Sequence, residues 1–546
     1  MRRGELDLIG GPLQGMRLVE ASAGTGKTYA VCLLYLRLLL ERGLDVSQIL
    51  VVSFTNAATA ELRERIRARL TGALHRLGNR DEAEQDPALR DLLARYASEG
   101  RDFDALRNVL ALAVADFDRS AIYTIHGFCK RVLDDEPFVT GLPLVLELVT
   151  DDAEIRDSVL ADLYRAWLAR HPPDAAMAAR LWDPSTLKRL GRELQRRLAK
   201  PLAKLVWPEK AAPAAPLSAN DDVSFQEARA LWLQERATIV GILKAGRAQL
   251  NGNIFTDKTI EDGASQWDEV FTAGHIAEVN RFDWNRIDRY RRSCQKPKQR
   301  QAPIGEHRFF DLADIVAAVL ARRADEVEAS WFRLLELIVE DGPEAVRAAK
   351  QTQRVMSFDD LLHQLHGKLN ASDAGATTLA GSLRARYPVA LVDEFQDTDP
   401  QQYGVFKAIY QTGGSLFLVG DPKQAIYRFR NADLNVYFAA SREAQAVETL
   451  THNQRSSKDY LDALNALFGR NRAAFGLEDL QYHPLELGQK RRPPFSDSAT
   501  SRAALQCWSL TTAAEGAPPT LQQARLWSAQ ATAADRKSTR LNSSHT

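Results

Sequence analysis

The sequence has few cysteines, and those it has are far apart. Cys32, Cys129, Cys294 and Cys507 are the only four in 546 residues, and no two of them form a CxxC pair. Zinc sites built on cysteine and disulfide frameworks need paired cysteines, so this scarcity argues against both. It is typical of proteins from a reducing compartment, and we expect a cytoplasmic protein.

Long hydrophobic runs are also missing. The longest apolar segment, Val31 to Leu40, carries Arg37 and is too short to cross a bilayer, which takes about 20 apolar residues in a helix. The residues after Met1 lack the apolar core of a signal peptide. These absences argue against a membrane protein, and we expect no membrane partner.

Neither sign of charge is in excess. Lysine and arginine total 71, as do aspartate and glutamate, so any basic surface must be local. An apolar content of 45% and a charged content of 26% are typical of globular proteins. The length predicts about three or four domains, and no internal repeat of about 20 to 50 residues is visible.

What is present is a glycine-rich segment with the spacing of a phosphate-binding loop. It lies between the apolar runs 16–19 and 29–40, in the order strand, loop and helix. Gly24 and Gly26 allow the backbone to curl so that N–H groups face phosphate oxygens, and the helix presents its positive end to the same anion. The expected nucleotide-binding residues are Ala21, Ser22, Ala23, Gly24, Thr25, Gly26, Lys27 and Thr28.

Two of these side chains have specific tasks in such a loop. Lys27 would reach the β- and γ-phosphates, and Thr28 would hold Mg²⁺ through its hydroxyl, so we expect ATP and Mg²⁺ as cofactors. One position departs from the consensus, because Ala21 stands where the first glycine is usual. The alternative is a glycine-rich turn that enters an ordinary helix.

A second apolar run supplies the carboxylates that this chemistry needs. Residues 389–392 predict a buried strand, and Asp393 and Glu394 follow it directly. Asp393 would bind the metal, directly or through water, and Glu394 would orient and polarise the attacking water as general base. Asp399 and Pro400 have the pattern of a helix start. The alternative is a strand end that happens to be capped by two acids.

The pattern of strands and helices divides the chain. Strands alternate with helices in 1–135 and again in 351–445, which predicts an α/β domain with a parallel sheet. Between them, 136–350 is dominated by helical stretches and is interpreted as an insertion. We expect 446–534 to begin a further α/β domain. The tail, 535–546, resembles the in-frame translation of a sequencing-library adapter, with a natural polar tail as the alternative.

One stretch of the insertion is strongly basic. Residues 286–300 hold seven lysines and arginines and one acid, Asp288, with Tyr290 among them and Trp284 just before. This composition suits contact with a nucleic-acid backbone. A solvated loop, or a helix face held by salt bridges, explains it equally well.

Further segments make the series more specific. In chain order the sequence reads EASAGTGKTY, VSFTNAATAELRERI, YTIHGFC, DEFQDTDPQQ, GDPKQAIYRFRNAD and NQRSS. This series resembles the motifs of the UvrD/Rep superfamily-one DNA helicases, and most closely those of the motor subunits of heteromeric ATP-dependent exonucleases. The resemblance implies a RecA-like P-loop fold and an ATP-hydrolysing DNA helicase, with single- and double-stranded DNA and companion subunits as partners.

The resemblance also implies roles for individual residues. Gln424 would sense the γ-phosphate and Arg455 would stabilise its charge during hydrolysis. The implied catalytic set is Lys27, Asp393, Glu394, Gln424 and Arg455. The implied DNA contacts are Phe54, Thr55, Asn56, His126, Tyr427 and Phe429. Without the family, the DNA set would be interpreted as a strand terminus, a structural histidine and core aromatics.

Two departures bear on the expected function. Gln454 stands where the family usually has an aromatic residue that stacks on adenine, and the chain ends before the last helicase motifs and any nuclease domain. For the complete protein the resemblance implies ATP-driven 3′ to 5′ translocation on single-stranded DNA, in double-strand break repair and recombination. For this chain the alternatives are an ATP- and DNA-binding fragment without motor activity and a small-molecule P-loop kinase.

Overall fold

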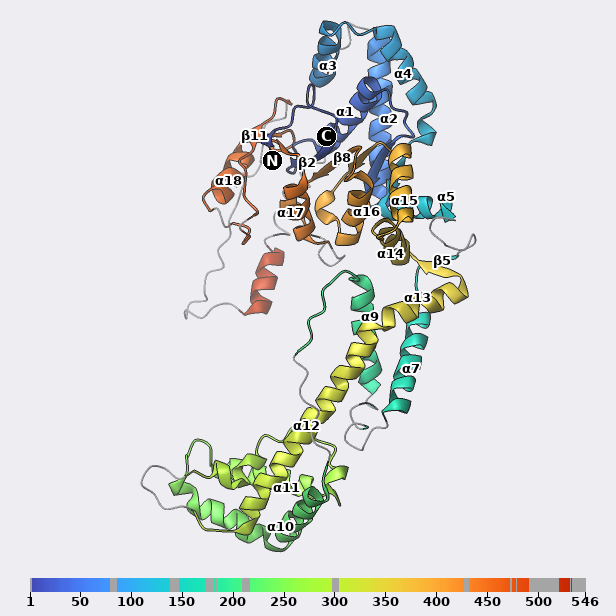
Figure 1. Ribbon diagram of the computed structural model, residues 1–546. Helices are drawn as coiled ribbons and strands as arrows, with labels where there is room; N and C mark the ends of the chain where they lie inside the picture. Colours follow the sequence, from blue (N-terminus) through green and yellow to red (C-terminus); the bar gives the residue numbers. More distant parts are fainter. Residues whose placement is uncertain are drawn as a thin grey trace. The chain divides into compact units, whose positions relative to one another are not determined.

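The computed structural model describes residues 2–78, 86–137, 147–171, 178, 181, 184–208, 217–296, 304–426, 432–471, 474–477, 479–490, 520–530 and 532. The chain divides into two compact units, residues 1–144 with 358–546 and residues 145–357. Figure 1 shows a sheet flanked by helices in the first unit and a set of helices in the second. The tail at 535–546, expected to be adapter-derived, lies outside the described residues.

The first unit is built on a parallel sheet. Within the described residues its seven strands lie in the order β1–β9–β2–β8–β7–β3–β4, and each pair of neighbours is parallel. The strands are β1 (Arg2–Glu5), β2 (Gly15–Ala21), β3 (Ile49–Ser53), β4 (Ile122–Thr124), β7 (Val389–Val392), β8 (Ser415–Gly420) and β9 (Ala446–Leu450). The expected α/β fold with a parallel sheet is confirmed.

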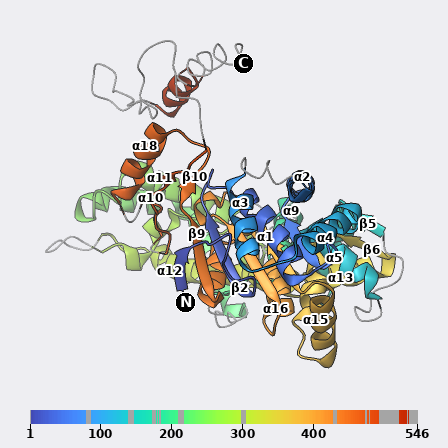
Figure 2. The same ribbon diagram turned by 90° about the horizontal axis from the view of Figure 1, so that it is seen from above.

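Helices cover both faces of this sheet, as Figures 1 and 2 show. Strands β3, β7 and β8 are therefore buried along their whole length. Because successive side chains of a strand point to opposite faces, continuous apolar runs are the pattern of a doubly covered sheet. The helices are α1 (Lys27–Arg42), α2 (Asn56–Gly78), α3 (Pro87–Ser98), α4 (Phe103–Ala115), α5 (Ile125–Asp135), α14 (Phe358–Leu369), α15 (Ala374–Arg386), α16 (Pro400–Tyr410), α17 (Leu434–Glu443) and α18 (Lys458–Gly469), with the 3₁₀ turns η2 (Phe117–Arg119), η7 (Phe395–Asp397) and η8 (Pro422–Gln424).

Helix α1 carries the longest apolar run into the core. Every residue of 30–40 is buried, including Arg37. Its guanidinium is bonded to the Glu41 carboxylate and to the carbonyl oxygens of Leu8 and Gly11. A buried cation is tolerated only when it is paired and hydrogen-bonded, so these bonds explain how a charge fits within the apolar helix.

Strand β9 extends the same sheet. It pairs with β1 and β2, and buried Glu448 forms a two-pronged ion pair with buried Arg17 of β2, at 2.9 and 2.5 Å. The expectation that a further domain begins at 446 is therefore corrected for this strand, because its backbone hydrogen bonds belong to the first sheet. Beyond it, β10 (His452–Asn453) and β11 (Glu486–Leu487) form a separate parallel pair.

The second unit is mainly helical. Its helices are α7 (Ala153–Arg170), α9 (Pro184–Ala199), α10 (Ala219–Gly246), α11 (Asp257–Val270), α12 (Arg308–Glu340) and α13 (Gly342–Gln353), with the 3₁₀ turns η3 (Arg247–Gln249), η4 (Ile276–Glu278), η5 (Ile287–Tyr290) and η6 (Arg292–Cys294). Strands β5 (Glu147–Val149) and β6 (Val355–Ser357) pair in parallel, which the sequence did not predict because three-residue strands leave no periodicity. Aromatic side chains of Trp232, Trp267 and Phe309 fill one of its cores.

Across the part of the chain that the structure describes, no helix is both long enough and apolar enough to span a bilayer.

Candidate functional site

The predicted site residues follow the carboxyl ends of neighbouring strands. In the register of the sheet, Val19 lies opposite Val419, Val392 opposite Leu418, and Ser53 opposite Thr124. Because the strands are parallel, the segments that follow them emerge at one edge, where open α/β sheets bind their ligands. The phosphate loop, the two acids and the residues after β3 and β4 are thus brought to the same edge.

The phosphate loop has the backbone that its glycines predict. Gly24 has φ 81° and Gly26 has φ 98°, which lie in the left-handed region that favours glycine. A Cβ on Gly24 would meet the Cβ of Arg455 at 2.8 Å, so a larger residue would also clash. The Thr25 hydroxyl donates to the Ser22 carbonyl oxygen at 2.8 Å and closes the loop.

Lys27 and Glu394 form an ion pair at the centre of the site. The Lys27 Nζ lies 2.6 Å from Glu394 Oε2, and the two side chains are 12% and 35% exposed. Glu394 has φ 51°, a left-handed conformation that costs a non-glycine residue of order 1–3 kcal/mol and occurs most at functional sites. Each group serves as the counterion of the other, so an incoming anion would compete with Glu394 for the lysine.

Asp393 supplies an oxygen that lacks a protein partner. Its Oδ1 is buried without a hydrogen bond among the described residues. Burial, reinforced by the Glu394 carboxylate, raises the pKa of Asp393 to about 6. A buried carboxylate oxygen left unpaired is costly unless a cation meets it. Asp393 and Thr28 therefore fit the oxygen ligands that Mg²⁺ prefers.

Gln396 links the acids to the next strand of the sheet. Its Nε2 donates to Glu394 Oε2 at 2.7 Å, and its Oε1 accepts from the Asp421 N–H at 2.9 Å. The Asp421 carboxylate in turn accepts from Gln424 Nε2 at 2.7 Å. A chain of hydrogen bonds thus runs from Glu394 to Gln424. Sequence reasoning assigned no role to Gln396, although its place two residues after Glu394 was a signal.

The segment after β9 is attached directly to the phosphate loop. The Asn453 amide donates to the Ala23 carbonyl oxygen at 2.9 Å, and the Gln454 N–H donates to the Gly24 carbonyl oxygen at 2.6 Å. Asn453 Oδ1 also accepts from the N–H groups of Arg455 and Ser456. Asn453 therefore places Arg455 beside the loop, a role that the sequence did not assign to it.

The phosphate loop borders an open cavity with a volume of about 710 Å³. Of the predicted side chains, Lys27, Thr28, Glu394, Gln424 and Arg455 line it. The wall includes Glu394 but not Asp393. Tyr29, Arg65, Gln454 and Lys490 also line it, and none of these four was predicted as a binding residue.

The described residues proposed to touch DNA, Phe54, Thr55, Asn56 and His126, follow the carboxyl ends of β3 and β4. The Thr55 hydroxyl accepts from the Ala58 N–H at 3.1 Å and so caps α2, while Asn56 is exposed. His126 packs edge-on against Phe358 at 6.3 Å between ring centroids. Burial lowers the pKa of His126 below its usual value, so the ring is neutral at pH 7 and offers hydrogen bonds rather than charge. Tyr427 and Phe429 lie outside the described residues.

Comparison with known proteins shows the family to which the chain belongs. The model of the UvrD/REP helicase N-terminal domain matches residues 9–445, which is most of the chain. The chain belongs to the UvrD/REP helicase family. The family resemblance predicted from the motif order is confirmed.

Among curated relatives, RecBCD enzyme subunit RecB of Escherichia coli K12 is 32% identical over 92% of this chain and 42% of its own length. RecB of Haemophilus influenzae is 32% identical over 86% of this chain and 41% of its own length. RecB of Mycolicibacterium smegmatis is 26% identical over 89% of this chain and 33% of its own length. The chain thus spans about two fifths or less of the length of these relatives.

The basic stretch at 286–300 is partly neutralised in the part that the structure describes. Arg291 pairs with Asp288 and Asp314, and Arg292 pairs with Asp311. Tyr290 is buried in the aromatic core. The salt-bridged interpretation therefore holds for Arg291 and Arg292, while 297–300 lies outside the described residues.

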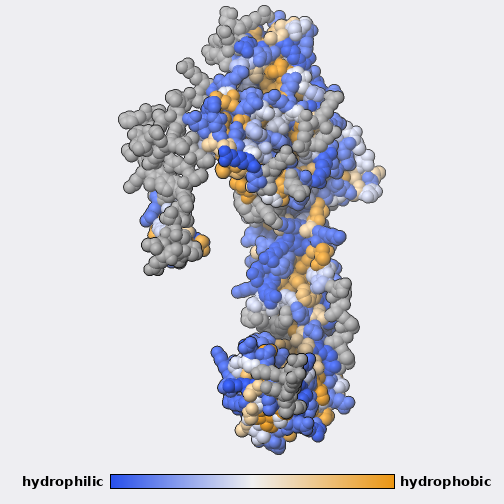
Figure 3. All heavy atoms as spheres, turned by 90° about the vertical axis from the view of Figure 1, so that its left-hand side faces the viewer, coloured by the Kyte–Doolittle hydropathy of each residue, from blue (hydrophilic) through white to orange (hydrophobic). Residues whose placement is uncertain are grey.

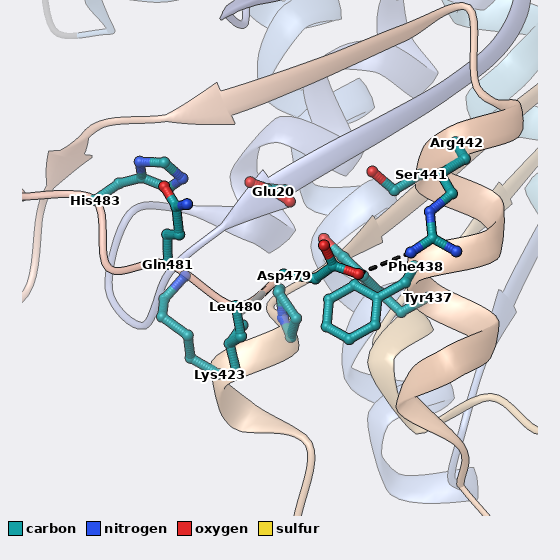
Figure 4. Close-up of a pocket in the computed structure, with 11 residues that line it drawn as sticks. Glu20, Lys423, Tyr437, Phe438, Ser441, Arg442, Asp479, Leu480, Gln481 and His483 are labelled. Atoms are coloured by element: carbon teal, nitrogen blue, oxygen red, sulfur yellow. Dashed lines mark hydrogen bonds and ion pairs between the residues drawn. The ribbon is translucent and has the colours of Figure 1, made fainter. Parts of the chain in front are cut away.

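A smaller cavity of about 280 Å³ lies between α17 and the segment 479–483. Figure 4 shows the Arg442 guanidinium directed at the Asp479 carboxylate, and the pair is 2.7 Å apart. Lys423 in the same wall is paired with Asp421 at 2.8 Å. Both of these cations are therefore paired with acids.

Proposed function

We propose that this chain carries the ATP-binding part of a DNA translocase subunit of the RecBCD type. One observation supports it most: Lys27, Thr28, Glu394, Gln424 and Arg455 line a single cavity at the phosphate loop. A kinase for small molecules would share the loop, but it would not need a sensing residue joined by hydrogen bonds to the general base.

In ATP hydrolysis, different residues of the chain would have different roles. The loop N–H groups and Lys27 bind the β- and γ-phosphates, and Thr28 with Asp393 hold the metal. Bound Mg²⁺ supplies charge neutralisation at the phosphates. Once phosphate replaces Glu394 as the partner of Lys27, the Glu394 carboxylate becomes available to orient water and accept its proton. Arg455 offsets the negative charge that develops on the γ-phosphate.

The hydrogen bonds through Gln396 and Asp421 offer a route from the phosphates to DNA. Gln424 lies at the cavity and is followed within the next few residues by Tyr427 and Phe429. A change of partner at Gln424 would shift this segment, and with it aromatic side chains that stack on bases. Phe54, Thr55, Asn56 and His126 would hold the strand at the adjoining strand ends.

The whole protein is proposed to act with companions. By likeness to the RecB relatives, we expect RecC- and RecD-like subunits as partners, single- and double-stranded DNA as substrate, 3′ to 5′ movement, and a role in double-strand break repair and recombination. We place it in the cytoplasm, because Cys32, Cys129 and Cys294 are free thiols, as is usual in a reducing compartment.

DNA-stimulated ATP hydrolysis tests the proposal. The 546-residue chain is assayed with Mg²⁺ and ATP, with and without an oligonucleotide, beside Lys27→Ala as the inactive control. Turnover that rises with DNA and is lost in the variant supports a motor. Nucleotide binding without any DNA effect on turnover would instead favour the second candidate, an ATP- and DNA-binding module without motor activity. Displacement of streptavidin from 3′- or 5′-biotinylated oligonucleotides reports polarity.

A further inference from the structure

The wall of the nucleotide cavity carries more positive charge than the proposed hydrolysis uses. The described residues that line it include four cations and a single acid: Lys27, Arg65, Arg455, Lys490 and Glu394. Lys27 pairs with Glu394, and Arg65 pairs with Glu61 of α2. Lys490 has no acidic partner among the described residues and no role in the hydrolysis proposed above. It is therefore a cation that an anion entering the cavity can meet.

Lys490 belongs to the 452–490 segment, which contains β10, α18 and β11 and has little core of its own. Its buried residues, within the part that the structure describes, are Asn453, Leu461, Leu480 and Gly488. Figure 3 shows that hydrophilic residues predominate on the face of the first unit turned to the viewer, the side on which α18 and β11 lie in Figure 1. The place of this segment beside the cavity therefore depends on the hydrogen bonds that Asn453 and Gln454 make with the phosphate loop.

Gln454 joins the phosphate loop to the backbone of Lys490. Its N–H donates to the Gly24 carbonyl oxygen at 2.6 Å, and its side-chain Oε1 accepts from the Lys490 N–H at 3.1 Å. The Gly488 N–H also donates to the Asn453 carbonyl oxygen at 2.8 Å. A Cβ on Gly488 would collide with the Gln454 side chain, so the close approach of the two strands requires glycine at this position.

These contacts give Gln454 a task that the aromatic ring usual at this position does not perform. The ring of the family stacks on the base, whereas the amide of Gln454 accepts a hydrogen bond from the backbone of the neighbouring segment. The amide thereby fixes the main chain from which the Lys490 side chain reaches the cavity wall.

We propose that Lys490 binds the phosphates of the nucleotide and that Gln454 positions it. A lysine ammonium group carries three donors and a full charge, and its bonds to phosphate oxygens are about twice as strong as bonds between neutral groups. Lys490 would thus be a second phosphate-binding lysine, supplied from outside the phosphate loop. The inference rests on the proposed function for its ligand, ATP, and adds a residue to that same site.

Equilibrium titration of the 546-residue chain with a fluorescent ATP analogue and Mg²⁺ tests the role of the charge. Lys490→Gln should raise the dissociation constant about 10-fold, the effect of one charge-assisted hydrogen bond. Lys490→Arg keeps the charge and should restore most of the affinity. An unchanged dissociation constant in Lys490→Gln overturns the proposal.

The positioning role of Gln454 is tested in the same titration. Gln454→Leu removes the acceptor of the Lys490 N–H and should weaken binding by a similar factor. The double variant Gln454→Leu, Lys490→Gln should bind no more weakly than Lys490→Gln alone, because residues that act through one contact do not have additive effects. Fully additive losses would overturn the claim that Gln454 acts through Lys490.

Tripolyphosphate, which has neither base nor ribose, identifies the part of the nucleotide that Lys490 meets. Its competition against the fluorescent analogue should weaken in Lys490→Gln by the same factor as the binding of the analogue itself. If the analogue binds more weakly but tripolyphosphate competes as strongly as before, the assignment to the phosphates is overturned.

Lys458→Gln is the matched control, because Lys458 is an exposed lysine of the same segment, paired with Asp462 at 2.6 Å. It should leave the dissociation constant at the parent value, and a loss equal to that of Lys490→Gln would attribute the effect to net charge and overturn the proposal. Lys27→Ala separates this inference from the proposed function. If Lys27→Ala abolishes binding while Lys490→Gln does not weaken it, only the role of Lys490 falls. If Lys27→Ala binds like the parent chain, the nucleotide site itself falls.

Discussion

The nucleotide cavity of the first unit and helix α9 of the second hold their positive charge in opposite ways. In the cavity, Lys27 is 12% exposed and meets one carboxylate at 2.6 Å. On α9, Lys188 and Arg192 face water and repeat along a helix. Charges that converge in a shielded pocket recognise a compact anion through geometry, whereas exposed, repeated charges recognise a polyanion through the number of contacts. Single substitutions should therefore be severe in the first region and mild in the second.

The largest effect is expected from Lys27→Ala. Loss of the amine removes the group that reaches the β- and γ-phosphates, so ATP turnover should fall by about 10²-fold or more. Binding of a fluorescent ATP analogue should weaken as well. Lys130→Ala is the control, since Lys130 is an exposed lysine bonded to Asp134. Equal loss in both variants would contradict the special role of Lys27.

Glu394→Gln should separate turnover from binding. The amide cannot accept the proton of water, so turnover should fall by about 10² to 10⁴-fold. Affinity for the nucleotide should stay or rise, because Lys27 loses the carboxylate with which phosphate competes. Steady-state rates together with equilibrium titration of the analogue measure the two effects. A variant that fails to bind nucleotide would show that Glu394 shapes the cavity instead.

The buried carboxyl group of Asp399 should make the stability of the first unit depend on pH. Burial raises the pKa of this N-cap of α16 to about 6, above the value of about 3.9 in an unfolded chain. Ionisation of Asp399 therefore destabilises the folded state, and the free energy of unfolding falls as pH rises from about 4 to about 6. Asp399→Asn keeps the cap without the charge. It should raise the free energy of unfolding by about 2 to 3 kcal/mol at pH 8 and little at pH 4.5.

Urea unfolding of the parent chain and Asp399→Asn at both pH values measures this difference. Asp393 and Asp397 have a raised pKa as well, but they are present in both proteins and cancel in the comparison. A gain of equal size at both pH values would mean that the charge is not the cause.

Gln396→Ala should weaken the fold and the site together. It leaves the Asp421 N–H without its acceptor and Glu394 without one donor, at a cost of about 1–3 kcal/mol in the free energy of unfolding. Turnover should fall while the Michaelis constant for ATP changes little, because Gln396 acts through Glu394. A change confined to stability would assign Gln396 a structural role only.

The smallest effect is expected at an exposed pair of the second unit. Arg236 and Asp268 are 2.8 Å apart and 40% and 44% exposed, so Arg236→Gln should cost about 1 kcal/mol or less, and less at high salt. Chemical unfolding at low and high salt checks this. A cost as large as that of Gln396→Ala would contradict the expectation that an exposed ion pair contributes less to stability than a buried hydrogen-bonding side chain.

The sequence predicted the parts of the site that depend on local spacing. A loop with Gly24 and Gly26 before Lys27, and acids directly after an apolar run, follow from the backbone and the strand period, which neighbouring residues set. Strands of three residues such as β5 and β6 were missed because they show no period. The place of β9 was mistaken because pairing with β1 and β2 is a long-range choice.

From its order of residues alone, the chain determined a parallel α/β sheet, a phosphate loop and the family to which it belongs. Only the tertiary structure decided that Lys27 pairs with Glu394, that Gln396 joins Glu394 to Asp421, and that Arg292 pairs with Asp311 while Lys188 and Arg192 of α9 are exposed. The physical reason is distance along the chain: these contacts join segments whose meeting depends on how helices and strands pack. Local spacing encodes only the ion pairs between residues three or four apart, such as Arg291 with Asp288.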